Sequence, residues 1–517
     1  MRIFEIFCFP LAAGLAAAFS TAAPAQDTNG DGYDELAVGV PFEEVNGDAY
    51  AGAANVLYGS LNGLGGTILD EIWHQDSPDI VGPSEPADHF GAAMAWGDFD
   101  GDGFADLAIG VPQEDVNGGA GNVSNAGGVH VLYGGPIWGL TSGSNFFFSR
   151  ADAWVPRGLD KDEGFGSALA AGDFDDDGYD DLAVGIPYTD DLGTGAQNSG
   201  SIIVVRGGSQ GLLQSGVKEW SQAGSIKDEP ETDDRFGAVL AVGDFNEDGT
   251  DDLAITAQTE VRPPNVGYGA VHVLYGADGT GLQADGNQIL TRYEVGFGIG
   301  AAGGELFGSS LAAGNFDGQG ADELAIGSYA AMVGSVIRAG QVYEVPGAPD
   351  GLVRNATVAW SQDSAGIAGT AQPNDFFGYA LCAGNFDADY TDDLAISAYG
   401  EDYGKGVVHV LEGRYQAGLT SSNSQLFWED DIPGAHSTSN AHFGAALACG
   451  RYDNDGPSDL AIGTPGEDLP GLMDVGAVHV IYGTYGFGLG DDRETWFQSA
   501  ADGQVEPGDQ FGQVFGR

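Results

Sequence analysis

The chain has 517 residues, of which 77 are Asp or Glu and 17 are Lys or Arg, so its formal net charge is −60. Such an acidic surface repels phosphate backbones and anionic lipids, which excludes nucleic acid as a partner. Apolar residues make up 42% of the chain, enough for a sizeable core and against intrinsic disorder. A chain of this length usually forms several domains, unless it consists of repeats that pack only on their neighbours.

The first 25 residues are typical of a secretory signal peptide. Arg2 precedes an apolar stretch from Ile6 to Phe19, and Ala23-Pro24-Ala25 fits the small-x-small cleavage rule. No later stretch is apolar over the ~20 residues that a membrane helix requires. We therefore expect cleavage near Ala25 and a mature chain, residues 26–517, that does not insert into a membrane. The expected location is extracellular, with the periplasm as the alternative.

The dipeptide Phe-Gly recurs along the whole chain at a nearly constant spacing. Its seven copies begin at Phe90, Phe165, Phe236, Phe307, Phe377, Phe443 and Phe511, at spacings of 75, 71, 71, 70, 66 and 68 residues. A fixed period of this kind is the signature of a repeat architecture. The mature chain is therefore predicted to be a single domain of seven repeats.

Each repeat has the order of a four-stranded meander. In the repeat that starts at Phe165, a small-residue strand over 165–174 is followed by an Asp-rich turn and by strands at 182–187, at 201–206 and around Trp220. Four short strands joined by Gly-rich turns are typical of a propeller blade. We predict an all-β, seven-bladed β-propeller whose blades lie at approximately 26–89 plus 508–517, 90–164, 165–235, 236–306, 307–376, 377–442 and 443–507.

The two ends of the repeat region distinguish a closed ring from a solenoid, which is the competing architecture. A solenoid needs polar capping repeats at its ends. Here the first repeat begins directly in an Asp-rich turn at Asp27, whereas Phe511 opens a strand that no turn follows. Because these halves complement each other, the last strand, Phe511 to Arg517, is expected to complete the first blade and close the ring.

The turn between the first and second strands of each repeat carries regularly spaced oxygen ligands. In the second repeat Asp98, Asp100, Asp102 and Asp106 stand at positions 1, 3, 5 and 9, and Gly103 at position 6 permits a sharp turn. Ca²⁺ takes six to eight oxygen ligands, whereas Mg²⁺ demands stricter octahedral geometry. An EF-hand is excluded, because the closing acid stands at position 9 rather than 12 and strands flank the loop. The pattern predicts calcium.

The same ligand pattern recurs in the other six repeats with varying completeness. The better loops offer Asp27, Asn29, Asp31 and Glu35 in the first repeat, Asp173, Asp175, Asp177 and Asp181 in the third, and Asp244, Asn246, Asp248 and Asp252 in the fourth. The weaker loops offer Asn315, Asp317 and Glu323 in the fifth, Asn385, Asp387, Asp389 and Asp393 in the sixth, and Asp453, Asp455 and Asp459 in the seventh.

Two of the weaker loops depart from the pattern at a defining position. Tyr390 replaces the turn glycine of the sixth loop, and Arg451 stands at position 1 of the seventh, where its guanidinium could replace the cation. For a single loop, a polar hairpin that binds nothing is an adequate alternative. Several copies at one position of the repeat predict calcium in at least three loops.

The order of Phe-Gly, Asp-rich loop and Gly-x-Pro strand end resembles the FG-GAP repeat of integrin α heads. The Gly-x-Pro ends are Gly39-Val40-Pro41, Gly110-Val111-Pro112, Gly185-Ile186-Pro187 and Gly463-Thr464-Pro465. The resemblance covers essentially the whole mature chain and implies a seven-bladed propeller with calcium in the hairpins of one face. Similar repeats accompany the catalytic domain of glycosylphosphatidylinositol phospholipase D and occur in many bacterial exported proteins. This chain has no inserted domain and no Arg-Gly-Asp sequence.

No motif predicts a catalytic site. No Gly-x-Ser-x-Gly elbow, zinc-type His pair or phosphate-binding loop stands out in the sequence. One slot of the third strand holds histidine in four repeats and other residues in three: His130, His272, His409 and His479 against Asn55, Ile203 and Tyr343. A slot that accepts isoleucine is structural, so we assign no catalytic residue.

The mature chain contains two cysteines, Cys382 and Cys449, on equivalent strands of adjacent repeats. They stand five and six residues after the local Phe of Phe-Gly. Because these offsets differ, two buried thiols are expected rather than a disulfide.

Paired acids follow the second strand of five repeats, at Glu43-Glu44, Glu114-Asp115, Asp190-Asp191, Glu401-Asp402 and Glu467-Asp468. They should project from the face opposite the calcium loops, either as a solvated rim or as a ring that binds a basic or glycan partner. The predicted function is a secreted, monomeric, non-catalytic calcium-binding module for adhesion or for binding an unidentified protein or glycan. The alternative is an extracellular enzyme, for example one that acts on a polysaccharide in the central funnel.

Overall fold

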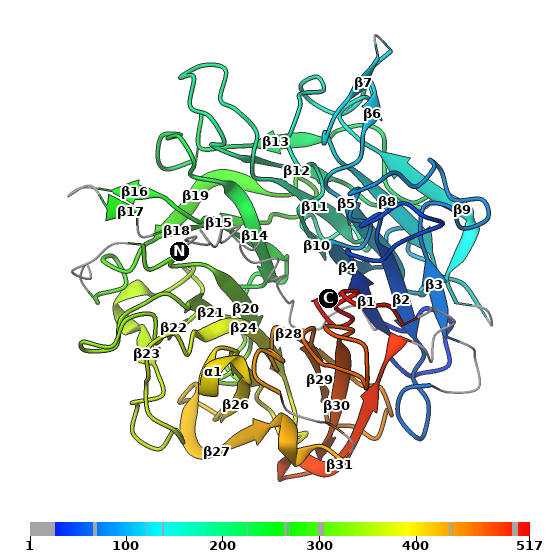
Figure 1. Cartoon of the computed structure of the whole chain (residues 1–517). Coiled ribbons are helices and arrows are strands. Elements are labelled where there is room, and N and C mark those ends of the chain that lie inside the picture. The colour runs from blue at the N-terminus through cyan, green and yellow to red at the C-terminus, as the bar shows by residue number, and fades with distance from the viewer. Residues whose placement is uncertain are drawn as a thin grey trace, which may run out of the picture.

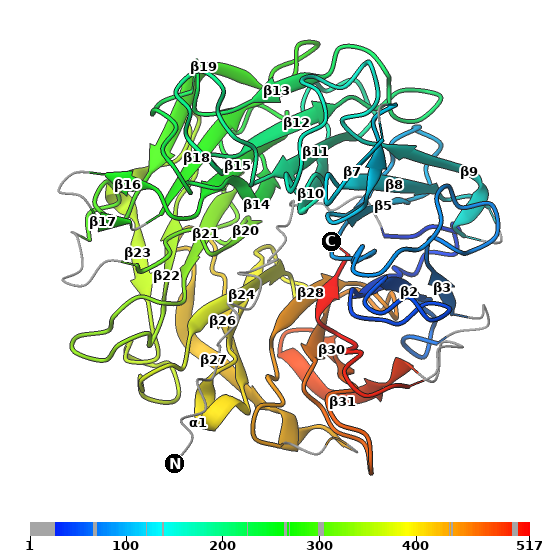
Figure 2. The ribbon, with the colours of Figure 1, turned by 45° about the horizontal axis from the view of Figure 1, so that its top comes forward.

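The computed structural model describes residues 26–65, 70–119, 121–136, 139–224, 226–262, 266–267, 269–297, 304–433, 435, 438–498 and 505–516. Seven four-stranded antiparallel sheets stand around a central axis as the blades of a β-propeller (Figure 1). The view turned by 45° shows the same ring of blades (Figure 2). The predicted all-β fold and blade number are confirmed. The predicted signal peptide, residues 1–25, lies outside the described residues.

The first four blades contain the following strands. Blade 1 combines β1 (Leu36–Val40), β2 (Ala53–Leu57) and β3 (Glu71–Trp73) with β32 (Val514–Phe515). Blade 2 consists of β4 (Ala93–Gly97), β5 (Asp106–Val111), β8 (Gly128–Tyr133) and β9 (Thr141–Phe148). Blade 3 consists of β10 (Ala168–Gly172), β11 (Asp181–Ile186), β12 (Ser201–Val205) and β13 (Lys218–Trp220). Blade 4 consists of β14 (Phe236–Gly243), β15 (Asp252–Ala257), β18 (Ala270–Tyr275) and β19 (Gln283–Leu290).

The other three blades follow the same order. Blade 5 consists of β20 (Ser310–Gly314), β21 (Glu323–Ser328), β22 (Gln341–Val345) and β23 (Val358–Trp360). Blade 6 consists of β24 (Phe377–Gly384), β25 (Asp393–Ala398), β26 (Val407–Glu412) and β27 (Thr420–Trp428). Blade 7 consists of β28 (Ala446–Gly450), β29 (Asp459–Thr464), β30 (Ala477–Thr484) and β31 (Gly488–Trp496).

A few short elements lie outside the blades. Two hairpins pair β6 (Val116–Asn117) with β7 (Asn122–Val123) and β16 (Val261–Arg262) with β17 (Val266–Gly267). The helical segments are α1 (Glu401–Gly404), η1 (Arg354–Ala356) and η2 (Glu429–Asp431). Within the parts of the chain that the structure describes, no helix has the length and apolarity of a membrane span.

The ring closes as the sequence predicts. Val38 and Gly39 of β1 pair with Phe515 and Val514 of β32, and the Gly516 amide donates to the Ala37 carbonyl at 2.8 Å. The red C-terminal strand therefore lies beside the blue first blade (Figure 1). Blade 1 thus joins both ends of the described chain, and an edge that would otherwise be open is paired.

The Phe-Gly pair is explained by the contact between neighbouring blades. A Cβ atom at Gly110 of β5 would collide with the carbonyl oxygen of Gly166, and one at Gly185 of β11 would collide with that of Gly237. The glycines of Gly-x-Pro and of the next Phe-Gly are therefore required for the close approach of two backbones. All seven phenylalanines of the Phe-Gly pairs are fully buried: Phe90, Phe165, Phe236, Phe307, Phe377, Phe443 and Phe511.

The repeated histidines pack inside the blades. Their rings contact the phenylalanine of the same blade, with centroids 5.4 Å apart for His130 and Phe90 and 5.3 Å apart for His272 and Phe236. Burial lowers the pKa of His130 to about 3, so its imidazole is neutral. The structure therefore supports the structural interpretation of this slot.

The expectation of two free thiols is wrong. Cys382 of β24 and Cys449 of β28 form a disulfide, with Cα atoms 6.2 Å apart, that joins the innermost strands of blades 6 and 7. Successive residues of a strand face opposite sides of the sheet. Adjacent blades face each other with opposite sides, so offsets that differ by one bring the two side chains together.

Reduction of this disulfide is expected to destabilise the protein. The bond spans a sequence separation of 67 residues, and closing a loop of that length corresponds to roughly 4 kcal/mol of chain entropy. Chemical denaturation with and without reductant measures the loss. The Cys382→Ala/Cys449→Ala double variant is the control and should not respond to reductant. Equal midpoints for oxidised and reduced wild-type protein would contradict the bond.

Candidate metal sites

Seven Asp-rich hairpins lie at the same end of the blades. In blades 2 to 7 each follows the innermost strand, and its position 9 begins the second strand, as Asp106 begins β5 and Asp181 begins β11. In blade 1, Glu35 at position 9 directly precedes β1. The aromatic residue at position 2 is fully buried in the second to seventh blades: Phe99, Phe174, Phe245, Phe316, Phe386 and Tyr452. Anchored in the core at position 2 and in the sheet at position 9, each hairpin holds its intervening oxygen atoms in place.

The side chain at position 1 shapes the loop. In the second loop the backbone N–H groups of Asp102 and Gly103 donate to the Asp98 carboxylate at 3.1 and 3.0 Å. Gly103 has a φ of +88°, which a side chain would disfavour. Equivalent bonds to the position-1 carboxylate form in the first, third and fourth loops. In the sixth loop Tyr390 does not adopt a positive φ, so that loop follows a different path.

The acid at position 9 is a buried anchor. Asp106 is 1% exposed and accepts hydrogen bonds from the backbone N–H groups of Phe99 at 3.0 Å and Gly134 at 2.9 Å. Burial, with a smaller contribution from Asp100, raises the pKa of Asp106 to about 8. Burial likewise raises the pKa of Glu35 to about 9. A carboxylate in this position is stabilised by a cation beside it.

Three of the seven loops bring three acids together. Ligand oxygens lie within 4.8 Å of one another for Asp27, Asp31 and Glu35, for Asp98, Asp100 and Asp106, and for Asp173, Asp175 and Asp177. Among the described residues, the fourth to seventh loops do not form such a group. The fourth loop contains an amide, Asn246, in place of one acid, and its position-1 bonds match those of the second loop. Acidic groups that could hold a metal are therefore present on this face.

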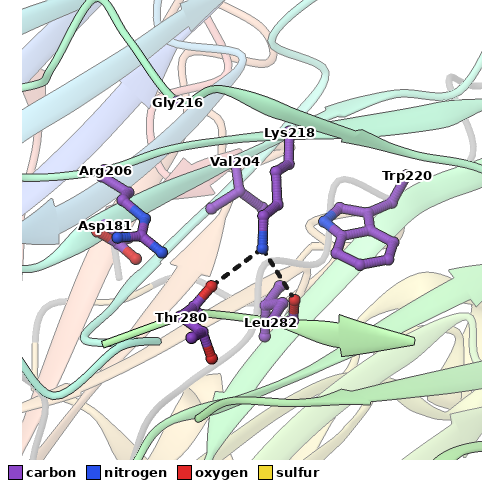
Figure 3. Close-up of a pocket in the computed structure, with 9 residues that line it drawn as sticks. Asp181, Val204, Arg206, Gly216, Lys218, Trp220, Thr280 and Leu282 are labelled. Carbon is purple, nitrogen blue, oxygen red and sulfur yellow. Dashed lines mark hydrogen bonds between the residues drawn. The ribbon is translucent and has the colours of Figure 1, made fainter. Parts of the chain in front are cut away.

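A basic side chain enters the third loop. The guanidinium of Arg206, which follows β12, lies 2.5 Å from the Asp175 carboxylate. Figure 3 shows Arg206 beside Asp181, while Lys218 donates to the carbonyls of Thr280 at 3.0 Å and Leu282 at 3.5 Å. The four predicted ligands of this loop are present, but a protein cation already neutralises part of their charge.

Arg451 does not play the role that the sequence suggested. Its guanidinium lies 4.0 Å from Asp34 of blade 1, and its backbone N–H donates to the same carboxylate at 2.8 Å. Among the described residues, no ion pair joins Arg451 to Asp453, Asp455 or Asp459 of its own loop. The guanidinium that does pair with an acid of a loop is that of Arg206, in the third loop.

The sequence analysis missed the residue at position 8. The Asp180 carboxylate of blade 3 accepts from the Asp98 N–H of blade 2 at 2.8 Å, and Asp251 accepts from Asp173 in the same way at 3.0 Å. Five blades make this bond, through Asp34, Asp180, Asp251, Asp322 and Asp392. The recurring pair of acids at positions 8 and 9 was the available signal. One acid of each pair holds the neighbouring blade, and the other faces its own loop.

The comparisons with known proteins agree with this geometry. The sequence profile of the FG-GAP repeat matches residues 18–57, 90–132, 165–205, 236–274 and 377–411. The chain contains five FG-GAP repeats. The profile covers the first, second, third, fourth and sixth loops and leaves out the fifth, where Gln319 stands at position 5, and the seventh, where Arg451 stands at position 1.

Relatives of this chain include two kinds of larger protein. It is 33% identical to the phosphatidylinositol-glycan-specific phospholipase D of Rattus norvegicus over 31% of this chain and 18% of that protein. It is 32% identical to integrin alpha-PS2 of Drosophila melanogaster over 52% of this chain and 17% of that protein. The matched segments thus span less than a fifth of these relatives. The solved rhamnogalacturonan lyase YesW is 13% identical with a TM-score of 0.32, a likeness too low to support an argument.

The second and seventh loops should differ in ion binding. Asp100→Ala removes one of three clustered acids and should cost one bound Ca²⁺ per chain. Asp455→Ala is the matched control and should cost none, because the seventh loop has arginine at position 1 and brings no third acid close. Elemental analysis of the two variants after gel filtration in calcium buffer measures the difference. Equal losses would refute this ranking of the loops.

Proposed function

We propose that this FG-GAP protein is an exported, calcium-stabilised module that binds a protein or glycan, or mediates adhesion, without catalysing a reaction. The acid clusters of the first three loops support calcium most directly, because three carboxylate oxygens within 4.8 Å of one another suit a hard divalent cation. Export is supported by the signal-like N-terminal segment and by the disulfide between Cys382 and Cys449, a bond that persists in oxidising compartments.

Calcium removal should destabilise the whole ring. With a Kd of roughly 1 mM, typical of extracellular modules, ~10 mM Ca²⁺ adds about 1.4 kcal/mol per occupied site. Three occupied sites then supply on the order of 4 kcal/mol, a large share of the stability of an ordinary domain. Thermal unfolding with calcium and with excess chelator tests this, with Mg²⁺ at equal ionic strength as the control. An unchanged melting temperature, with no metal in the purified protein, would refute calcium stabilisation.

The face opposite the metal loops offers a place for a ligand. A cavity of about 350 Å³ spans blades 2 to 4, and its lining includes His89, Pro112 and Tyr188. The Arg235 guanidinium lies 5.8 Å from the centre of the Tyr188 ring, so an aromatic face and a fixed cation stand together. Aromatic faces and planar hydrogen-bond donors suit the flat apolar faces and hydroxyl groups of a sugar, which favours a glycan ligand.

The bonds inside this cavity favour binding over catalysis. The Ser167 hydroxyl donates to the Gly164 carbonyl at 2.6 Å, and Asp162 accepts from the Asn125 amide at 2.7 Å. These bonds occupy the serine and the acid, so the two groups do not form a nucleophile–base pair with His89. An enzyme that acts on a polysaccharide remains the second candidate, because the cavity is wide enough for a sugar and contains an acid.

A glycan array, followed by affinity measurement on each hit, tests the ligand proposal. Tyr188→Ala should weaken binding roughly tenfold, the effect expected for the loss of an aromatic contact. Tyr390→Ala is the control, because Tyr390 is 91% exposed on the opposite face. Polysaccharide activity screens run beside the array. Turnover of a screened polysaccharide that Asp162→Ala abolishes would overturn the non-catalytic proposal.

A further inference from the structure

The residue directly before each Phe-Gly occupies the same structural position in all seven blades. Its backbone has a positive φ in every copy, between +56° and +66°. The seven residues in this position are His89, Gly164, Arg235, Leu306, Phe376, His442 and Gln510. Burial lowers the pKa of His89 and of His442, which leaves both imidazoles neutral at pH 7. Blade 4 therefore places a permanent cation where the other blades have a neutral residue.

A second polar side chain stands beside Arg235. Strands β14 and β15 pair with Phe236 opposite Ala257, so Arg235 and Gln258, one residue beyond this pair, lie next to each other at the end of the two strands. Four other blades have proline in the position of Gln258: Pro41, Pro112, Pro187 and Pro465. Gln258 thus adds an amide group that these prolines do not supply.

The protein satisfies neither side chain. The Arg235 guanidinium faces the Tyr188 ring, and it forms no ion pair or hydrogen bond with a residue that the structure describes. Gln258 is 2% exposed, and its Nε2 atom has no acceptor within the described structure. Buried N–H groups without acceptors cost free energy. Because both residues line the cavity of blades 2 to 4, a molecule bound there can supply the missing acceptors.

The other ionisable groups of the cavity leave the charge of Arg235 uncompensated. Asp162 is the one acid among the described lining residues. Its carboxylate pairs with Lys161 Nζ at 2.8 Å and accepts from the Asn125 amide at 2.7 Å. The positive charge of Lys161 balances that of Asp162, and His89 is neutral. The cavity therefore offers one free positive charge in a chain whose net charge is −60.

An aromatic ring lies beside this cation. A Cβ atom at Gly164 would lie 3.0 Å from Cδ2 of Tyr188, so the glycine in this position leaves room for the ring. The ring is open to a ligand, because Tyr188 is 39% exposed. The Arg235 guanidinium carbon is 5.8 Å from the ring centre. An anionic group bound to Arg235 would thus place the rest of a ligand next to an aromatic face.

We propose that this cavity selects a glycan with a single anionic group, either a carboxylate or a sulfate ester, which Arg235 binds while the sugar ring packs on Tyr188. This selectivity rests on the proposed glycan-binding function of the same cavity. The guanidinium presents paired N–H donors that match two oxygens of a carboxylate or sulfate, and such charged hydrogen bonds are stronger than neutral ones. The amide of Gln258 is a further partner for the ligand.

The charge of the whole chain limits the ligand to few anionic groups. The cavity has one uncompensated cation, whereas the chain has 77 acids and 17 basic residues. The other charges of a polyanionic glycan would face this acidic surface, and their repulsion extends over about 8 Å at physiological ionic strength. A neutral glycan with one isolated acidic sugar should therefore bind more tightly than a uniformly acidic chain of the same length.

A glycan array with neutral, singly anionic and polyanionic chains tests this selectivity. Wild-type protein should prefer the singly anionic glycans, and Arg235→Gln should weaken their binding roughly tenfold or more, as expected for the loss of a charged hydrogen bond. Arg235→Lys should lose less, because it keeps the charge without the planar donors. Arg414→Gln is the matched control. It removes an exposed arginine from the turn after β26, whose backbone N–H donates to Phe316 on the metal-loop face.

The outcomes distinguish this selectivity from glycan binding itself. Methyl esterification of a carboxylate ligand should weaken binding about as much as Arg235→Gln does, whereas a preference for singly sulfated chains would support the same site with the ester as its ligand. Neutral glycans that bind and respond to Tyr188→Ala but not to Arg235→Gln would overturn the anionic ligand and leave the glycan site in place. An array without a bound glycan would overturn both.

Discussion

The need to neutralise buried carboxylates governs both faces of this propeller. The blades end in acids that the fold removes from water, as Asp106 and Glu260 show, at 1% and 2% exposed. Basic residues are too few to pair with them, at 17 against 77 acids. Backbone N–H groups donate to the position-9 carboxylates of the loops, as Phe99 does to Asp106. Guanidinium groups pair with buried acids at two contacts between blades and in the third loop. Elsewhere a proton or a bound cation is the remaining means of compensation.

The same carboxylates also position the blades. Asp180 holds the backbone of the preceding loop, while its neighbour Asp181 faces its own loop and fixes the start of β11. Ion binding at position 9 and blade contact at position 8 are therefore one residue apart on a rigid strand. The Phe-Gly contact also joins neighbouring blades, because the backbones at Gly110 and Gly166 lie too close together to admit a side chain. An ion bound in a loop would thus act on the interface between two blades as well as on one hairpin.

The sevenfold repeat made the fold and the loops predictable from the sequence, because comparing the seven copies shows which residues they share and where one copy departs from the pattern. What could not be predicted depends on how adjacent blades face each other. The offsets of Cys382 and Cys449 were taken as evidence against a disulfide, although facing sheets require offsets of opposite parity. Arg451 stands in the loop by sequence but points to Asp34 of the next blade, whereas Arg206 enters the third loop from the end of the third strand of the same blade. Position along the chain does not reveal either contact.

A buried acid that pairs with an arginine and a buried acid that needs a bound ion depend differently on the environment. The ion pairs of Arg150 with Glu163 and of Arg292 with Glu305 do not require an ion from the medium, since their cation is part of the chain. A loop neutralised by calcium would hold only where the ion is abundant, at the 10⁻⁴–10⁻³ M that suits the affinity of extracellular modules. A ring that mixes both kinds would keep some contacts between blades fixed and make others depend on calcium. Because the cavity of blades 2 to 4 adjoins the Arg150–Glu163 ion pair, that wall of the proposed ligand site should stay fixed whether or not calcium is present.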